Sequence, residues 1–247
     1  MTTQHLARPD GHTIAFRRIE GEDPTIVWIG GYRSDMNGTK ARHLEALARE
    51  RGWSYLAFDH FAHGASSGDF AEATIGRWRE DALAVIDEAS AGPLVLVGSS
   101  MGGWISLLAA LARPERLHGL VLIAPAPDFA HDLMWPSLTD ETRQAIMRDG
   151  AVPVSDPDGL GDYVLTRRFF DEARNWTLLD RPLPLTCRVH ILHGREDESV
   201  PLAHAERLRD LIEAPALGFT LIEDGDHRLS RDQDLSRLAA IVGEMRS

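Results

Sequence analysis

The stretch LVLVGSSMGGWISLLAALA, residues 94–112, contains a short apolar run, a turn of serines and glycines, and a longer apolar segment in succession. Leu94–Val97 has the length and β-branched content of a buried strand, whereas Gly103–Ala112 has the length of a helix. A strand that passes directly into a helix is the repeating unit of a parallel sheet covered by helices on both faces. The stretch therefore predicts an α/β fold.

The same pattern of strand and helix recurs along the chain. The expected strands are residues 25–31, 53–59, 93–99, 119–125, 187–194 and 218–225, and the expected helices are residues 40–51, 75–89, 103–112, 204–212 and 232–245. The N-terminal residues 3–19 predict a β-hairpin with Pro9–Gly11 at its turn. We expect a single domain over residues 1–247, since a chain of this length commonly forms one α/β domain.

The alternation breaks once, between residues 129 and 184, where helix-like pieces are separated by prolines and glycines. A structureless loop of that length is uncommon inside a compact domain. We therefore expect a helical cap, inserted before the strand at residues 187–194. Its apolar side chains would line a substrate pocket, and Met134, Trp135 and Phe169 are our candidate contacts.

Ser100 is the candidate nucleophile within the opening stretch. Gly98 and Gly102 flank it in a GxSxG pattern, whereas Ser99 has Val97 and Met101 at the same two offsets. A serine exposed on a tight strand-to-helix turn has a strained backbone, and side chains two residues before or after it would collide with the turn. Glycine at both offsets removes the collision at Ser100 alone.

A candidate acid and a candidate base follow Ser100 in chain order. Asp197 lies just after the strand that ends at Gly194, and His227 lies beyond Gly225 in the loop after the next strand. Serine, acid and histidine, each at the carboxyl end of a different strand, match the order of an α/β-hydrolase triad. Histidine can take and return a proton near neutral pH, and Asp197 would orient its ring. Glu196 and Glu198 remain alternative acids, although we expect both to face solvent.

The oxyanion of an acyl-transfer intermediate needs two N–H donors. One is the N–H of Met101 at the predicted helix start, where the helix dipole favours negative charge. The other comes from WIGGYRSDMNGTK, residues 28–40, where we expect the N–H of Tyr32 to donate, with Gly31 as the alternative.

Composition excludes several other classes of function. The 38 acidic and 26 basic residues give a net charge of −12, which disfavours binding to nucleic acid or to an anionic membrane. The N-terminus lacks the apolar core of a secretory signal and no apolar stretch is long enough to insert into a membrane, so we expect a cytoplasmic protein. Cys187 is interpreted as a buried strand thiol.

Two close pairs of histidines, His60 with His63 and His190 with His193, have no cysteine partner and no HExxH pattern. We expect these side chains to pack in loops and strands and expect neither a metal nor a cofactor.

Taken together, GGYRSDMNGTKA, FDHFAHGASSG, LVGSSMGGW, HGREDESVP and DGDHRLS resemble the α/β-hydrolase superfamily. More narrowly, they resemble bacterial relatives of a mitochondrial α/β-hydrolase-domain esterase that acts on acyl glucuronides and on palmitoyl thioesters of proteins. The resemblance implies a mostly parallel sheet of about eight strands, with an antiparallel strand near the N-terminus and helices on its faces. It also implies Ser100 as nucleophile, Asp197 as acid and His227 as base.

The sequence therefore predicts a serine hydrolase that cleaves carboxylic esters or thioesters of a small-molecule or acylated substrate through an acyl-enzyme. The alternatives are the same triad acting on a lactone, an amide or a carbon–carbon bond, and a non-catalytic protein that uses the fold to bind a ligand.

Overall fold

The computed structural model describes residues 2–155 and 161–247. The strands are β1 (Gln4–Ala7), β2 (Thr13–Ile19), β3 (Glu22–Ile29), β4 (Trp53–Phe58), β5 (Leu94–Ser99), β6 (Leu117–Ile123), β7 (Ala151–Val154), β8 (Tyr163–Thr166), β9 (Leu183–Pro184), β10 (Arg188–Gly194), β11 (Ile212–Glu213) and β12 (Leu217–Ile222). The α-helices are α1 (Thr39–Arg51), α2 (Ile75–Ala89), α3 (Met101–Ala112), α4 (Trp135–Ser137), α5 (Asp140–Asp149), α6 (Arg167–Ala173), α7 (Leu202–Leu211) and α8 (Asp232–Arg246). Short helical turns are η1 (Phe70–Glu72), η2 (Pro114–Arg116), η3 (Ala130–Met134) and η4 (Arg174–Trp176).

Within these described residues, eight strands form one sheet in the order β1-β2-β4-β3-β5-β6-β10-β12. In this spatial order, every pair of neighbours from β4 across to β12 is parallel. The strand β2 instead pairs antiparallel with both β1 and β4. The predicted α/β-hydrolase sheet, its antiparallel strand and its N-terminal hairpin are confirmed. In a parallel sheet the carboxyl ends of neighbouring strands lie at one edge, so the loops that follow β3, β5, β10 and β12 meet there.

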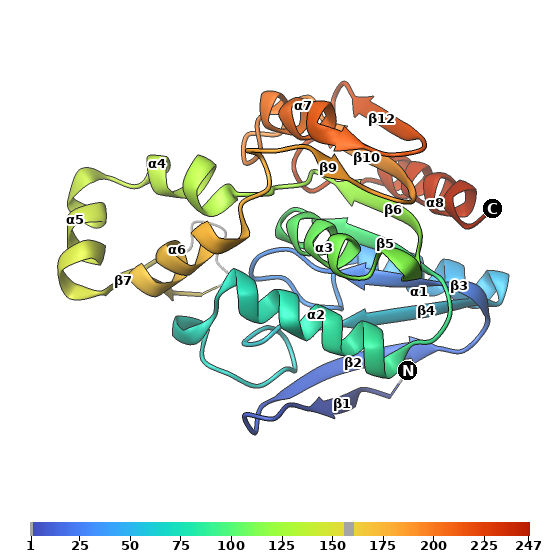
Figure 1. The fold of residues 1–247 in the computed structure, drawn as a ribbon, viewed down its shortest axis with the longest axis horizontal. Helices are drawn as coiled ribbons and strands as arrows, with labels where there is room; N and C mark the ends of the chain where they lie inside the picture. Colours follow the sequence, from blue (N-terminus) through green and yellow to red (C-terminus); the bar gives the residue numbers. More distant parts are fainter. Residues whose placement is uncertain (1, 156–160) are drawn as a thin grey trace.

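Helices cover both faces of the sheet, with α2 and α3 on one face and α1 and α8 on the other (Figure 1). Each face has its own apolar core. Leu96 of β5 packs with Trp78 and Trp104 on the first face, while the adjacent Val95 and Val97 point into the second. Because both faces of β5 are buried, its residues Leu94–Val97 are all apolar rather than alternating with polar ones.

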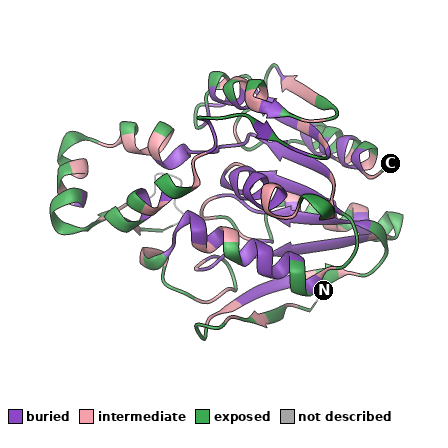
Figure 2. Cartoon of the chain, viewed as in Figure 1, coloured by how far each residue is buried: buried purple, intermediate pink, exposed green. Residues whose placement is uncertain are grey.

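The segment between β6 and β9 extends away from the sheet (Figure 1), and its outer end is mostly exposed, whereas the central strands are buried (Figure 2). Besides the expected helices it contains a hairpin, β7 with β8, that the sequence analysis did not expect. Each strand of this hairpin has four residues, and Pro153 interrupts the first, so the stretch is too short to give a clear alternating pattern.

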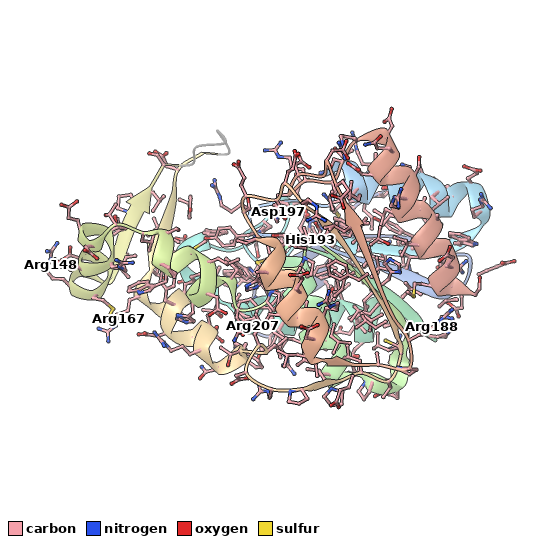
Figure 3. All side chains as sticks on the ribbon, turned by 90° about the horizontal axis from the view of Figure 1, so that it is seen from above. Arg148, Arg167, Arg188, His193, Asp197 and Arg207 are labelled. Atoms are coloured by element: carbon pink, nitrogen blue, oxygen red, sulfur yellow. The ribbon has the colours of Figure 1, made fainter. Side chains whose placement is uncertain are left out.

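Polar contacts attach this segment to the rest of the molecule. The carboxylate of Asp128 accepts hydrogen bonds from the backbone N–H groups of Leu178 and Leu179, so the two ends of the segment are held together. Arg207 of α7, labelled in Figure 3, pairs with Asp132 at 2.9 Å and donates to the carbonyl of Leu179 at 2.7 Å. The base of the segment is therefore fixed against α7.

No helix in the described ranges is both long enough and apolar enough to cross a membrane.

Candidate active site

Ser100 lies between β5 and α3 in a strained backbone conformation, with φ 55° and ψ −120°. A Cβ atom at Gly98 would lie 2.2 Å from Ser106 Oγ, and one at Gly102 would lie 2.0 Å from the carbonyl oxygen of Ile29. Both contacts are far inside van der Waals distance, so only glycine fits at these two positions. The steric argument made for Ser100 from the sequence holds in the structure.

Hydrogen bonds fix the strained turn on both sides of the serine. The Ser100 N–H donates to the carbonyl of Ile123 at 2.9 Å, and the Ser100 carbonyl accepts from the N–H groups of Gly103 at 2.8 Å and Ala126 at 3.1 Å. A strained residue persists when its surroundings determine its conformation in this way. The side chain of Ser100 is thus presented at the carboxyl edge of the sheet.

Asp197 is 6% exposed and follows the end of β10, as predicted. Its Oδ1 accepts hydrogen bonds from the N–H of Ser199 at 2.9 Å and of Val200 at 2.7 Å. This arrangement leaves Oδ2 for His227, whose Nδ1 lies 2.8 Å away. The neighbouring Glu196 and Glu198 are exposed, so Asp197 is the carboxylate that contacts the imidazole.

His227 lies in the loop after β12, and its Nε2 lies 3.0 Å from the Oγ of Ser100. The loop is ordered by Asp226, whose Oδ1 accepts the N–H of Leu229 at 2.8 Å. Lys40 of α1 donates a hydrogen bond to the carbonyl of Arg228, and burial lowers the pKa of this lysine to about 8. The three residues chosen from the sequence are therefore brought together in one hydrogen-bonded chain.

A second histidine, His193, lies beside Asp197 at the end of β10 (Figure 3). Its Nε2 lies 3.1 Å from the carbonyl of Val200, to which it donates, and 3.8 Å from Asp197 Oδ2. Burial lowers the pKa of His193 and thereby favours the neutral form of this ring beside Asp197. The sequence alone predicts only packing for this histidine.

The candidate oxyanion donors lie next to Ser100. A Cβ atom placed on Gly31 would lie 3.3 Å from Ser100 Cβ, so the backbone after β3 passes directly beside the serine. Among the described residues, the N–H of Tyr32 meets no protein acceptor. Met101 is the first residue of α3, so its N–H has no partner within the helix. Two backbone donors are thus available to a ligand atom beside Ser100.

A cavity of about 830 Å³ opens onto Ser100 and His227. Its wall is mostly apolar and consists of Tyr32, Arg33, Met101, Ala126, Phe129, Asp132, Leu133, Met134, Pro136, Ser137, Leu138, Val154, Tyr163, Leu165, Glu198, Ser199, Val200 and Pro201.

Of the three predicted substrate contacts, Met134 lies on this wall and two do not. Trp135 instead packs on the ring of Phe170, with ring centroids 4.8 Å apart, and Phe169 is 4% exposed in the core beneath Tyr32. Neither side chain lines the cavity, so these two predictions are wrong: Trp135 is held by its contact with the Phe170 ring, and Phe169 is part of the buried core.

No group of three or more histidine, cysteine, aspartate or glutamate side chains in the described part of the chain could hold a metal ion. The histidines of the two predicted pairs make other contacts. His190 forms a hydrogen bond with the Thr220 hydroxyl, and His60 and His63 lie among aromatic rings. Cys187 is buried, and burial raises the pKa of its thiol to about 11.

Comparison with known proteins relates this geometry to a family. The model of the family Serine aminopeptidase, S33 matches residues 22–172, more than half of the chain. Palmitoyl-protein thioesterase ABHD10 of rat is 36% identical over 99% of this chain and 82% of its own length. The human protein of the same name is 34% identical over 97% of this chain and 78% of its own length.

Two solved structures are similar over almost the whole chain. A putative hydrolase from Agrobacterium vitis superposes with a TM-score of 0.93 at 38% identity, covering 100% of this chain and 99% of that one. Alpha/beta hydrolase domain-containing protein 10 from mouse superposes with a TM-score of 0.90 at 35% identity, covering 99% and 98%. The chain therefore belongs to the serine aminopeptidase S33 family of α/β-hydrolases, together with the ABHD10 proteins.

Proposed function

We propose that Ser100, His227 and Asp197 are the catalytic triad of this hydrolase, which cleaves carboxylic esters or thioesters. The observation that carries the proposal is the unbroken chain of two contacts, from Asp197 Oδ2 to His227 Nδ1 at 2.8 Å and from His227 Nε2 to Ser100 Oγ at 3.0 Å. Both distances allow hydrogen bonds, and the proton on Nδ1 leaves Nε2 as the acceptor that faces the serine.

In the first half of the reaction, Ser100 Oγ attacks the carbonyl carbon of the substrate while His227 Nε2 takes the hydroxyl proton. The carbonyl oxygen becomes negatively charged and accepts hydrogen bonds from the N–H groups of Tyr32 and Met101, with Gly31 as the alternative donor. His227 then gives its proton to the departing alcohol or thiol, and the acyl group stays on Ser100.

In the second half, His227 removes a proton from water, and the hydroxide attacks the acyl-enzyme. The tetrahedral intermediate collapses, Ser100 Oγ regains its proton from His227, and the carboxylic acid leaves. Asp197 stays ionised throughout. Its charge stabilises the imidazolium of His227, which forms in both halves.

The size and the lining of the cavity favour a substrate with a long apolar acyl group. Its volume of about 830 Å³ and its mostly apolar wall provide room and contacts for an extended chain next to Ser100. The rat relative is named a palmitoyl-protein thioesterase. We propose that this chain also accepts long-chain acyl thioesters.

We further propose that residues 1–247 act as one domain and that residues 129–184 form its cap, because Leu133, Met134 and Leu138 of this segment line the cavity. We also propose a cytoplasmic location for this chain, although the rat and human relatives are named mitochondrial. Fractionation of the source cells tests that location.

A substrate panel tests the proposed function. Acyl esters and thioesters of two to sixteen carbons, together with lactones and amides, are assayed with the wild-type protein and with Ser100→Ala. We expect turnover of esters and thioesters that is lost in Ser100→Ala. Turnover of lactones or amides alone, or equal turnover by both proteins, would contradict the proposal.

A further inference from the structure

We propose that His63 is a positioning residue, which fixes the backbone that carries the oxyanion donor through one acceptor nitrogen. The inference rests on the proposed role of the Tyr32 N–H as a donor. We call residues Gly30–Arg33 the oxyanion loop. His63 comes from a different segment, the turn that follows β4, and reaches this loop across the end of the sheet.

The partners of His63 define its hydrogen positions. Its Nδ1 lies 2.9 Å from the carbonyl oxygen of Phe61, which only accepts, so Nδ1 carries the proton. Its Nε2 accepts the N–H of Arg33 at 2.9 Å. The ring must therefore be neutral and in the Nδ1–H form. A protonated ring would present an N–H to the N–H of Arg33.

The peptide that His63 holds is strained. Arg33 has φ 57°, a left-handed conformation that is unfavourable for a residue with a side chain. The same residue follows Tyr32, whose N–H is the proposed donor. On the other side of the loop, the carbonyl of Gly31 accepts from the N–H of Ser34 at 3.2 Å and from its hydroxyl at 2.8 Å. The hydrogen bond to His63 thus acts together with these contacts to hold the strained turn in place.

His63 is itself held rigidly. The Phe61 carbonyl that accepts its proton also accepts Trp78 Nε1 at 3.1 Å, and the Phe61 N–H donates to the buried Asp81 at 3.0 Å. The imidazole is 4% exposed and lies edge-on to Trp78, with ring centroids 5.4 Å apart. These contacts define one position for Nε2 and hence for the N–H that it accepts.

Burial keeps the ring of His63 neutral. It lowers the pKa of His63 to about 4, and the nearby Arg33 guanidinium acts in the same direction. The neighbouring ring of His60, 5.8 Å away, is also neutral, because burial lowers its pKa to about 3. His63 therefore stays an acceptor over the working pH range of a neutral esterase.

This arrangement predicts a specific kinetic effect. Charge develops on the substrate oxygen in the transition state, so a displaced Tyr32 N–H weakens transition-state binding more than ground-state binding. Loss of the His63 acceptor should lower kcat and leave KM nearly unchanged. A role in packing alone would lower the stability of the protein without this separation of kcat from KM.

The test compares His63→Leu, His63→Gln and His63→Asn with the wild type. The amide oxygen of glutamine can reach the place of Nε2, whereas that of asparagine is one methylene too short. Turnover of p-nitrophenyl butyrate gives kcat and KM, inhibition by phenylboronic acid reports binding of a tetrahedral oxyanion mimic at Ser100, and thermal unfolding shows that each variant is folded. His190→Leu makes the matched change at a strand histidine that pairs with Thr220.

We expect kcat to fall about 10- to 100-fold in His63→Leu and His63→Asn, with KM within about twofold and a parallel loss of phenylboronic acid affinity. His63→Gln should keep kcat within about fivefold of the wild type, and His190→Leu should have the kcat of the wild type. If His63→Leu does not fold, the difference in kcat between His63→Gln and His63→Asn tests the inference.

Two results would overturn the inference while leaving the proposed function intact. One is unchanged kcat in folded His63→Leu or His63→Asn, and the other is equal loss in the glutamine and asparagine variants. Substrate turnover by Ser100→Ala at the wild-type rate would instead remove the proposed function, and this inference with it.

Discussion

The Nε2 atom of His227 lies 3.0 Å from the Oγ of Ser100, although 127 positions separate the two residues in the chain. The contact forms because each residue follows a strand of the parallel part of one sheet, β5 for Ser100 and β12 for His227. The loops after β10 and β12 lie against each other and hold this contact in place. They are so close that a Cβ atom at Gly194 would lie 2.3 Å from the carbonyl oxygen of Gly225. The loops that carry Asp197 and His227 therefore touch through their backbones.

Asp197→Asn should lower kcat about 10³- to 10⁴-fold. The N–H groups of Ser199 and Val200 occupy Oδ1, so an asparagine would place its oxygen there and turn its NH₂ toward His227. The imidazole would then carry its proton on Nε2 and could not accept one from Ser100. Steady-state hydrolysis of p-nitrophenyl butyrate measures the loss. Glu196→Gln, one residue away and exposed, is the control and should retain the wild-type rate.

Gly102→Ala should destabilise the protein by about 1–3 kcal/mol and reduce its activity. The added methyl would lie 2.0 Å from the carbonyl oxygen of Ile29, a backbone atom that cannot move without shifting β3. Gly243→Ala is the matched control in α8, where the nearest atom would be 3.7 Å away. It should stabilise by about 0.5–1 kcal/mol, because alanine favours a helix over glycine. Urea unfolding compares the two, and a stable, fully active Gly102→Ala would contradict the steric account.

Met134→Trp should shorten the acyl chain that the cavity accepts. The larger side chain fills space on the cavity wall, so we expect kcat/KM for decanoyl and longer esters to fall about 10-fold or more. Acetyl ester hydrolysis should stay within about threefold. Met147→Trp makes the same change on α5 at a residue that is 47% exposed, and it should leave the whole chain-length profile unchanged. If Met134→Trp lowered kcat/KM equally for acetyl and decanoyl esters, the acyl chain would not lie against Met134.

His60→Phe should stabilise the protein more at pH 5 than at pH 7. Burial lowers the pKa of His60 from 6.5 to about 3, so below pH 6.5 the unfolded chain binds a proton that the folded protein does not. Stability of the wild type is therefore lost as pH falls from 6.5 toward 3, and phenylalanine removes this loss. The gain on substitution should be larger at pH 5 by about 2 kcal/mol. Urea unfolding of both proteins at the two pH values measures it; a gain that is the same at both would show that His60 titrates normally.

The fold, and the meeting of Ser100, Asp197 and His227 at one edge of the sheet, could be predicted because they depend on local patterns. Short apolar strands fix the sheet, the glycines beside Ser100 mark the turn, and the strand ends locate Asp197 and His227. The cavity wall could not be predicted, because the direction of Trp135 depends on where a short helix rests. The contacts of Lys40 and His63 could not be predicted for a similar reason: Lys40 donates to, and His63 accepts from, the backbone of a segment distant in the sequence.

The most direct test of the central claim is to map the residue that a fluorophosphonate probe modifies. Wild-type protein, Ser99→Ala and Ser100→Ala are labelled under the same conditions, digested and analysed by mass spectrometry. We expect one adduct on Ser100 in the wild type, the same adduct in Ser99→Ala, and no labelling in Ser100→Ala. An adduct on any other residue of the wild type, or undiminished labelling of Ser100→Ala, would contradict the assignment of Ser100 as the nucleophile.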